Sequence, residues 1–197
     1  MRIDIVVYDG FDELDALGPL EVLRSAADLG ADLSARLVSR TDQPVVVGSH
    51  GARVGIDGVF DPGVDGVVVA GGRWVARGDV GAWGEVQRGD WLPMLVAAAD
   101  RGALMASVCT GAMLLAHAGI IGTRRATTHH AALADLEATG ATVAVGRVVD
   151  DGDLVTCGGV TSGIDLALWL VERLASAEVA AAVAANLEYQ PVRPARR

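Results

Sequence analysis

The chain alternates short, continuously apolar runs with longer segments whose apolar residues recur at helical spacing. Apolar runs of about four to eight residues, rich in Val and Ile, are typical of strands that are buried on both faces. On this basis we predict strands at residues 3–8, 35–39, 44–47, 52–56, 67–70, 104–108, 125–128 and 142–145, and a pair of strands within 148–156 that turns at residues 150–153. We predict helices at residues 18–29, 91–101, 112–119, 130–139, 161–175 and 176–187.

Strands that alternate with helices form a mostly parallel sheet with helices on both faces. We therefore predict an α/β fold in a single domain, residues 1–189, because 197 residues fit one such domain better than two. Residues 9–17 are predicted to form a loop, and residues 73–89 a less regular segment. The Pro- and Arg-rich residues 190–197 are expected to be a frayed basic tail.

One predicted strand-to-helix junction carries a cysteine. Cys109 follows the apolar run 104–108, and a helical pattern begins just after it. The small residues Ser107 and Gly111 flank it at two positions on either side, as the crowded corner of a nucleophile elbow requires. Free N–H groups at the start of a helix favour a negatively charged sulfur, so we expect the pKa of Cys109 to be lowered to roughly 3.5–7.5. The alternative is a small, buried core residue.

Two more features follow strands of the same predicted sheet, and ligands bind at the carboxyl ends of such strands. Asp15 lies among apolar residues after the first strand, where partial burial would raise its pKa and let it transfer protons. It could equally cap the following helix. Gly71 and Gly72 follow the third strand and could present backbone N–H groups to a reacting atom, or simply form a turn.

The remaining candidate groups give weaker signals. His129 follows a predicted strand and could approach the same edge of the sheet. Cys157 precedes two glycines and is expected to be a packed thiol, although it could also line the pocket. Asp12 and Glu13 lie earlier in the first loop and are expected to be solvated. No histidine pair has metal-binding spacing with matching partners, so we expect no metal.

Composition narrows the function further. A net charge of −9 argues against nucleic acid as a partner, because phosphates are bound by Lys and Arg. The sequence has no stretch of 18 apolar residues and no visible signal peptide, so we expect no membrane span and no secretion. Two cysteines do not make a disulfide framework, which favours a reducing, cytoplasmic location.

Several motifs together resemble the ThiJ/PfpI superfamily over nearly the whole chain. These are Leu14-Asp15-Ala16-Leu17-Gly18-Pro19, Gly71-Gly72, Ser107-Val108-Cys109-Thr110-Gly111, Ala126-Thr127-Thr128-His129 and Thr161-Ser162-Gly163-Ile164-Asp165. The resemblance implies a class I glutamine-amidotransferase-like fold, a flavodoxin-like three-layer sandwich. It also implies a nucleophile at Cys109, a general acid/base at Asp15, and backbone donors from Thr110 and the Gly71-Gly72 turn. A supporting role for His129 stays open.

Within the superfamily, the pairing of Asp-x-x-Gly-Pro with Ser-Val-Cys-Thr-Gly is most similar to the isonitrile hydratases. It is also similar to the first domain of AraC-type regulators, although we expect no room for a helix-turn-helix domain before Arg197. The resemblance implies a homodimeric enzyme that needs no cofactor and hydrates a small isonitrile to a formamide. The alternatives are a redox or small-molecule sensor and a glyoxalase- or amidase-like enzyme. Thr110 argues against the peptidases, which carry His directly after the Cys.

Overall fold

The computed structural model describes residues 1–194. Residues 190–194 have no regular secondary structure, and the end of the predicted tail, residues 195–197, lies outside the described residues. No helix in the described part of the chain is long and apolar enough to cross a membrane.

The main sheet of the described residues has seven strands, in the order β10-β11-β7-β6-β1-β2-β5. Its strands are β1 Arg2–Val6, β2 Ser34–Ser39, β5 Gly58–Val59, β6 Gly66–Val69, β7 Leu104–Ser107, β10 Val148–Asp150 and β11 Leu154–Cys157. Neighbouring strands are parallel except for the edge pair β10–β11. The mostly parallel sheet predicted from the alternating pattern is confirmed.

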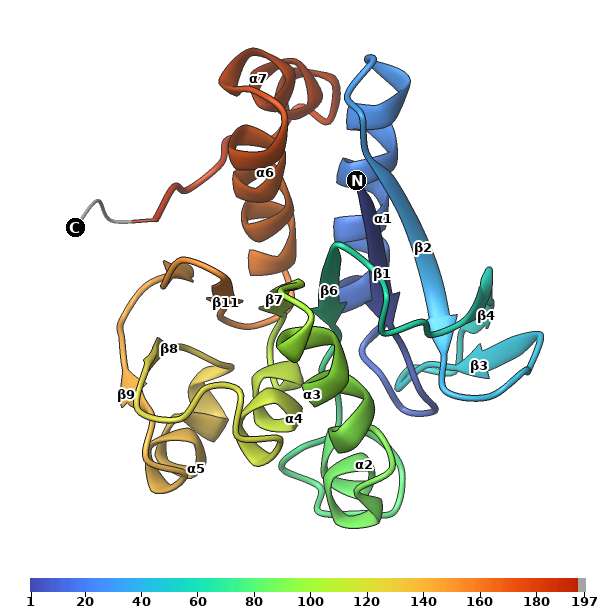
Figure 1. Ribbon diagram of the computed structural model, residues 1–197, viewed down its shortest axis with the longest axis vertical. Coiled ribbons are helices and arrows are strands. Elements are labelled where there is room, and N and C mark those ends of the chain that lie inside the picture. The colour runs from blue at the N-terminus through green and yellow to red at the C-terminus, as the bar shows by residue number, and fades with distance from the viewer. Residues whose placement is uncertain (195–197) are drawn as a thin grey trace.

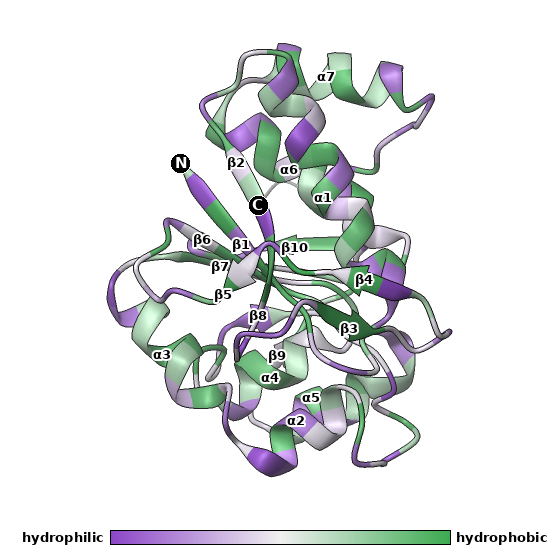
Figure 2. Ribbon diagram, turned by 90° about the vertical axis from the view of Figure 1, so that its right-hand side faces the viewer, coloured by the Kyte–Doolittle hydropathy of each residue, from purple (hydrophilic) through white to green (hydrophobic). Residues whose placement is uncertain are grey.

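Helices cover both faces of this sheet, which makes the three layers visible in Figure 2. One face carries α1 Glu13–Asp28, α6 Ser162–Leu174 and α7 Ala177–Asn186. The other carries α2 Ala82–Arg88, α3 Leu92–Asp100, α4 Gly111–His117 and α5 Leu133–Ala138, preceded by the short 3-10 helix η1 His130–Ala132. Two small sheets lie outside the main one, formed by β3 Val45–Val47 with β4 Arg53–Gly55 and by β8 Arg125–Ala126 with β9 Thr142–Val143.

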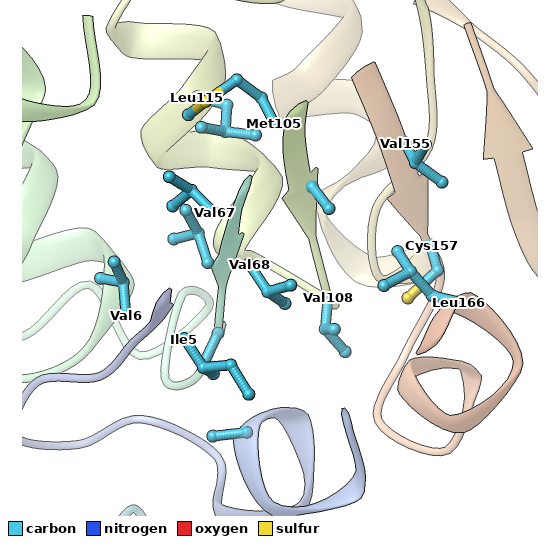
Figure 3. Packing of buried hydrophobic residues seen from close by; sticks show 14 of the residues in the cluster. Ile5, Val6, Val67, Val68, Met105, Val108, Leu115, Val155, Cys157 and Leu166 are labelled. Atoms are coloured by element: carbon cyan, nitrogen blue, oxygen red, sulfur yellow. The ribbon is translucent and has the colours of Figure 1, made fainter. Parts of the chain in front are cut away.

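The core is built from aliphatic side chains of the central strands. Ile5 on β1, Val68 on β6 and Val155 on β11 are all completely buried, and Figure 3 shows them between the helix layers. Because these strands are buried on both faces, their sequences are largely apolar instead of alternating, although Asp4 on β1 and Thr156 on β11 are buried polar exceptions. The carboxyl ends of β1, β6 and β7 meet at one edge of the sheet, and the loops that follow them carry the candidate site.

Helix α1 begins earlier than predicted. The side chain of Asp12 accepts a hydrogen bond from the Leu14 N–H at 3.3 Å and caps the helix at its true start. Pro19 lies inside the helix and not in its first turn, where proline is favoured, and it only removes the hydrogen bond to the Asp15 carbonyl. Asp15 therefore lies in the first helical turn, and the prediction of a loop through residue 17 was wrong.

Two further elements were not predicted. The segment 73–89, expected to be irregular, contains α2, which ends at Gly89 with a left-handed φ of 74°. The turn-rich stretch after residue 57 contains the two-residue edge strand β5. Both elements are short, and α2 contains a glycine, so tertiary packing decides their structure more than local propensity does.

Candidate active site

Cys109 occupies the corner between β7 and α4. Its φ of 55° lies in the left-handed region, which non-glycine residues seldom adopt outside functional sites. The corner is crowded, because a Cβ at Gly111 would lie only 2.1 Å from the carbonyl oxygen of Val69. Ser107, on the other side, is completely buried. The predicted elbow, with small residues at both positions, is confirmed.

Two later segments of the chain hold the backbone of this corner. The Cys109 N–H donates to the Gly158 carbonyl at 3.0 Å. The hydroxyl of Thr128 donates to the Cys109 carbonyl at 2.8 Å. The elbow is therefore fixed from the loop after β11 as well as from its own strand and helix.

Asp15 reaches the elbow from the first turn of α1. Its side chain is completely buried, and Oδ2 accepts a hydrogen bond from the Gly71 N–H at 3.0 Å. Oδ1 has no partner with regular hydrogen-bond geometry among the described residues. Burial, reinforced by the nearby charge of Asp12, raises the pKa of Asp15 to about 8. Because Asp12 caps the helix, Asp15 is not the cap, and it is a carboxylic acid at neutral pH.

The thiol of Cys109 is only 5% exposed. Burial and the Asp15 carboxyl raise its pKa to about 12, although the N–H groups of Val160 and Thr110 act in the opposite direction. The predicted lowering of this pKa was therefore wrong. The start of α4 does little to lower this pKa, because the Gly111 N–H already donates to the Val108 carbonyl at 2.9 Å. At neutral pH the site holds a thiol beside a carboxylic acid.

Gly71 and Gly72 have a different role from the predicted one. The Gly71 N–H is engaged by Asp15, and the Gly72 N–H donates to the Thr110 hydroxyl at 2.9 Å. A Cβ at Gly71 would lie 2.4 Å from the Thr110 nitrogen, so only glycine permits this approach. The pair therefore orients two side chains of the site instead of presenting two free donors.

Val160 belongs to the site and was not predicted. It has a φ of 35°, and its N–H acts to lower the pKa of the Cys109 thiol. The preceding glycines at 158 and 159 were the sequence signal for this loop, but not for its donor. His129 packs against Gly159, where a Cβ would lie 2.6 Å from the imidazole ring. No hydrogen bond in residues 1–194 joins His129 to the thiol or to Asp15, so its supporting role stays a prediction.

Cys157 is a packed core residue. It is completely buried at the end of β11, and burial raises its pKa well above the ordinary value. Figure 3 shows its sulfur close to Leu166 of α6. The expectation of a packed thiol is confirmed.

Glu13 is not solvated as expected. Its Oε1 accepts from the His50 N–H at 2.9 Å and the Ala52 N–H at 3.2 Å, and its Oε2 lies 2.9 Å from His50 Nδ1. Burial opposes ionisation, but these hydrogen bonds outweigh it and lower the pKa of Glu13 to about 2. Asp12, Glu13 and His50 each bring one potential metal-ligand atom within 4.8 Å of the others. The hydrogen bonds between Glu13 and His50 already account for that pair without an ion.

A pocket of about 410 Å³ adjoins the elbow. Two of its lining residues, Thr128 and Gly158, hold the Cys109 backbone. The pocket is lined by Thr127, Thr128, His130, Leu133, Val143, Ala144, Val145, Gly146, Arg147, Gly158, Gly159 and Ser162. Neither Cys109 nor any carboxylate is among these residues, so the pocket lies beside the reacting pair, and small aliphatic side chains and glycines form much of its wall.

Comparisons with known proteins agree with this architecture. The chain is 33% identical over 196 residues to an isonitrile hydratase of Pseudomonas putida, covering 98% of this chain and 81% of that protein. It is 30% identical over 194 residues to the HTH-type transcriptional regulator CdhR of Pseudomonas aeruginosa, covering 96% of this chain and 55% of the regulator.

Solved structures show the same fold. A ThiJ/PfpI family protein from Pseudomonas syringae matches with a TM-score of 0.86 at 24% identity, over 99% of this chain and 77% of that one. Oxidized DJ-1 of Toxoplasma gondii matches with a TM-score of 0.79 at 24% identity, over 95% and 98% of the two chains. Residues 1–173 match the DJ-1/PfpI family, which confirms the resemblance inferred from the motifs, and the chain belongs to that family.

Proposed function

We propose that this protein hydrates an isonitrile to an N-substituted formamide, with Cys109 as nucleophile and Asp15 as general acid and base. The observation that supports this proposal is the buried pair itself, a carboxylic acid whose pKa responds to a hydrogen bond with the neighbouring Cys109 thiol. Similarity to an isonitrile hydratase over 98% of the chain adds to it.

The first step joins the thiol to the isonitrile carbon. That carbon, in R–N≡C, is a poor electrophile until it is protonated, so an acid must lie beside the nucleophile. Asp15 gives its proton to the carbon, the Cys109 sulfur bonds to the same carbon, and the thiol proton passes to the carboxylate. The product is the thioimidate R–N=CH–S–Cys109, and Asp15 is again protonated.

Water completes the reaction. Proton transfer through Asp15 lets water add to the thioimidate carbon while the nitrogen is protonated, giving R–NH–CH(OH)–S–Cys109. The carbon–sulfur bond then breaks, the hydroxyl proton is lost, and the sulfur is reprotonated, releasing R–NH–CHO. The Thr110 and Val160 N–H groups stabilise negative charge on the sulfur as that bond forms and breaks. None of these steps calls for a cofactor.

The pocket beside the elbow suits an apolar substituent R, because it holds no carboxylate and has largely aliphatic walls. We further propose, as predicted from the sequence, that the protein is cytoplasmic and homodimeric. Light scattering of the purified protein at micromolar concentration tests the dimer, and a monomer would contradict it.

A second candidate is small-molecule sensing without turnover, because the regulator CdhR is 30% identical over 96% of this chain. A redox sensor is disfavoured, since burial raises the pKa of Cys109 and sensor thiols are exposed thiolates. Formamide production from n-butyl isonitrile, measured by chromatography for the wild type and for Cys109→Ala, separates the two candidates. Catalysis by the wild type alone supports the hydratase, whereas isonitrile binding without product by either protein supports the sensor.

A further inference from the structure

An ion pair between a partly exposed arginine and a buried carboxylate lies outside the Cys109–Asp15 pair. Arg147 Nε lies 2.6 Å from Asp165 Oδ2, and the Asp165 side chain is completely buried on α6. A buried carboxylate is tolerated when its oxygens are paired and hydrogen-bonded, and removing one partner is strongly destabilising. We therefore expect the Arg147–Asp165 pair to keep its geometry in the folded protein.

Arg147 holds both ends of the loop that follows β11. Its carbonyl accepts from the Gly158 N–H at 2.9 Å, and its Nη2 donates to the Thr161 hydroxyl at 3.2 Å. Val160 lies between these two anchors and has a strained φ of 35°, and Gly158 at the start of the loop accepts a hydrogen bond from the Cys109 N–H at 3.0 Å. A strained backbone conformation persists only where the surrounding structure holds it, so the two hydrogen bonds of Arg147 help to hold the Val160 backbone in its conformation.

The segment that follows α7 also donates hydrogen bonds to Asp165. The Tyr189 hydroxyl donates to Asp165 Oδ2 at 3.1 Å, and the Val192 N–H donates to Oδ1 at 2.7 Å. Figure 1 shows this segment leaving α7 and passing beside α6. Asp165 thus receives hydrogen bonds from Arg147 and from the C-terminal segment together.

We propose that Arg147 is a positioning residue for the Cys109 thiol, held by Asp165 and the C-terminal segment so that the loop of residues 158–161 stays in place against the Cys109 elbow. The proposal rests on the proposed function only in taking Cys109 as the reactive group. A displaced loop withdraws a hydrogen-bond donor from the thiolate, and the thiol becomes harder to ionise.

The test is the rate of Cys109 alkylation by iodoacetamide between pH 7 and 10, with the full chain and no isonitrile. Arg147→Lys keeps the charge but loses the planar fork that contacts Asp165 and Thr161 together. We expect the rate to fall about 3- to 10-fold at each pH, corresponding to a rise of about 0.5–1 in the thiol pKa. The other titratable groups near the sulfur, Asp15, Asp12, Tyr8 and Cys157, are unchanged in this variant.

Arg124→Lys is the matched control. Arg124 pairs with Asp151 and Asp153, next to the opposite end of β11 from the elbow, so its loss should leave the alkylation rate unchanged. An unchanged or faster rate in folded Arg147→Lys, or an equal fall in the control, overturns the proposal.

If Arg147→Lys does not fold, the same alkylation rate is measured for Tyr189→Phe. It removes one hydroxyl donor to Asp165, and we expect the rate to fall about twofold, a smaller effect in the same direction. A wild-type rate in this variant would then overturn the proposal. Because the readout is alkylation, the outcome is independent of whether the protein hydrates isonitriles.

Discussion

Replacing Asp15 by Asn should make the protein more stable and less active at neutral pH. Burial raises the pKa of Asp15 from 3.8 to about 8, so the folded protein keeps a proton that the unfolded chain loses above pH 4. Between these two values the folded state binds more protons, and stability must fall as pH rises. Asn cannot ionise in either state, so the variant does not lose stability in this way as the pH rises.

The magnitude follows from the size of the shift. Each unit of pKa difference corresponds to about 1.4 kcal/mol, so the penalty at pH 7 approaches about 4 kcal/mol. Asp15→Asn should therefore gain up to about 4 kcal/mol over the wild type at pH 7 and almost nothing below pH 4. Activity should fall by about 10²–10⁴-fold, as is typical when a general acid/base is lost.

Urea unfolding at several pH values between 3.5 and 8, followed by circular dichroism, measures this difference. Asp12→Asn is the comparison variant, because Asn caps a helix about as well as Asp, and loss of the Asp12 charge, the smaller cause of the raised Asp15 pKa, should give a smaller gain than Asp15→Asn. A stability gain for Asp15→Asn that does not grow with pH would refute the raised pKa. Retained activity would remove the acid/base role.

Three further outcomes are expected. Iodoacetamide should label Cys109 before Cys157, which is completely buried, as read by peptide mass spectrometry; the reverse order would contradict the elbow assignment. Peroxide at pH 7 should oxidise Cys109 more slowly than glutathione, because burial raises its pKa to about 12; rapid formation of sulfinic acid would indicate a thiolate. Ala144→Leu should lower kcat/KM for cyclohexyl isonitrile about 10-fold more than for methyl isonitrile; an equal effect on both would exclude the pocket as the substituent site.

The sequence predicts the central sheet well because its strands are buried on both faces. The runs at β1, β6 and β7 are largely apolar, with the buried Asp4 of β1 as an exception, so they have few alternative explanations as strands, and parallel pairing then brings the loops at their carboxyl ends together. The position of Cys109 between two small residues is a local pattern, and the structure confirms the elbow it predicts.

The electrostatics of the site could not be predicted in the same way. The pKa of Cys109 depends on its depth of burial and on which N–H groups remain free, and both are set by tertiary contacts. The sequence predicts that Asp15 lies near the elbow, but it does not show whether Asp15 caps the helix or is a buried acid. The answer depends on Asp12, which caps the helix in its place. The Val160 N–H, which acts to lower the thiol pKa, belongs to a loop that Arg147 anchors, and such an arrangement has no local signature.

The most direct test is to trap the covalent intermediate. Wild-type protein is mixed with n-butyl isonitrile, quenched with acid within one turnover, and weighed by intact-protein mass spectrometry with peptide mapping. We predict a mass increase equal to one molecule of the isonitrile, located on Cys109 and absent from Cys109→Ala, because the thioimidate forms by addition without loss of any atom. Formamide production without an adduct on Cys109, or undiminished production by Cys109→Ala, would contradict the mechanism.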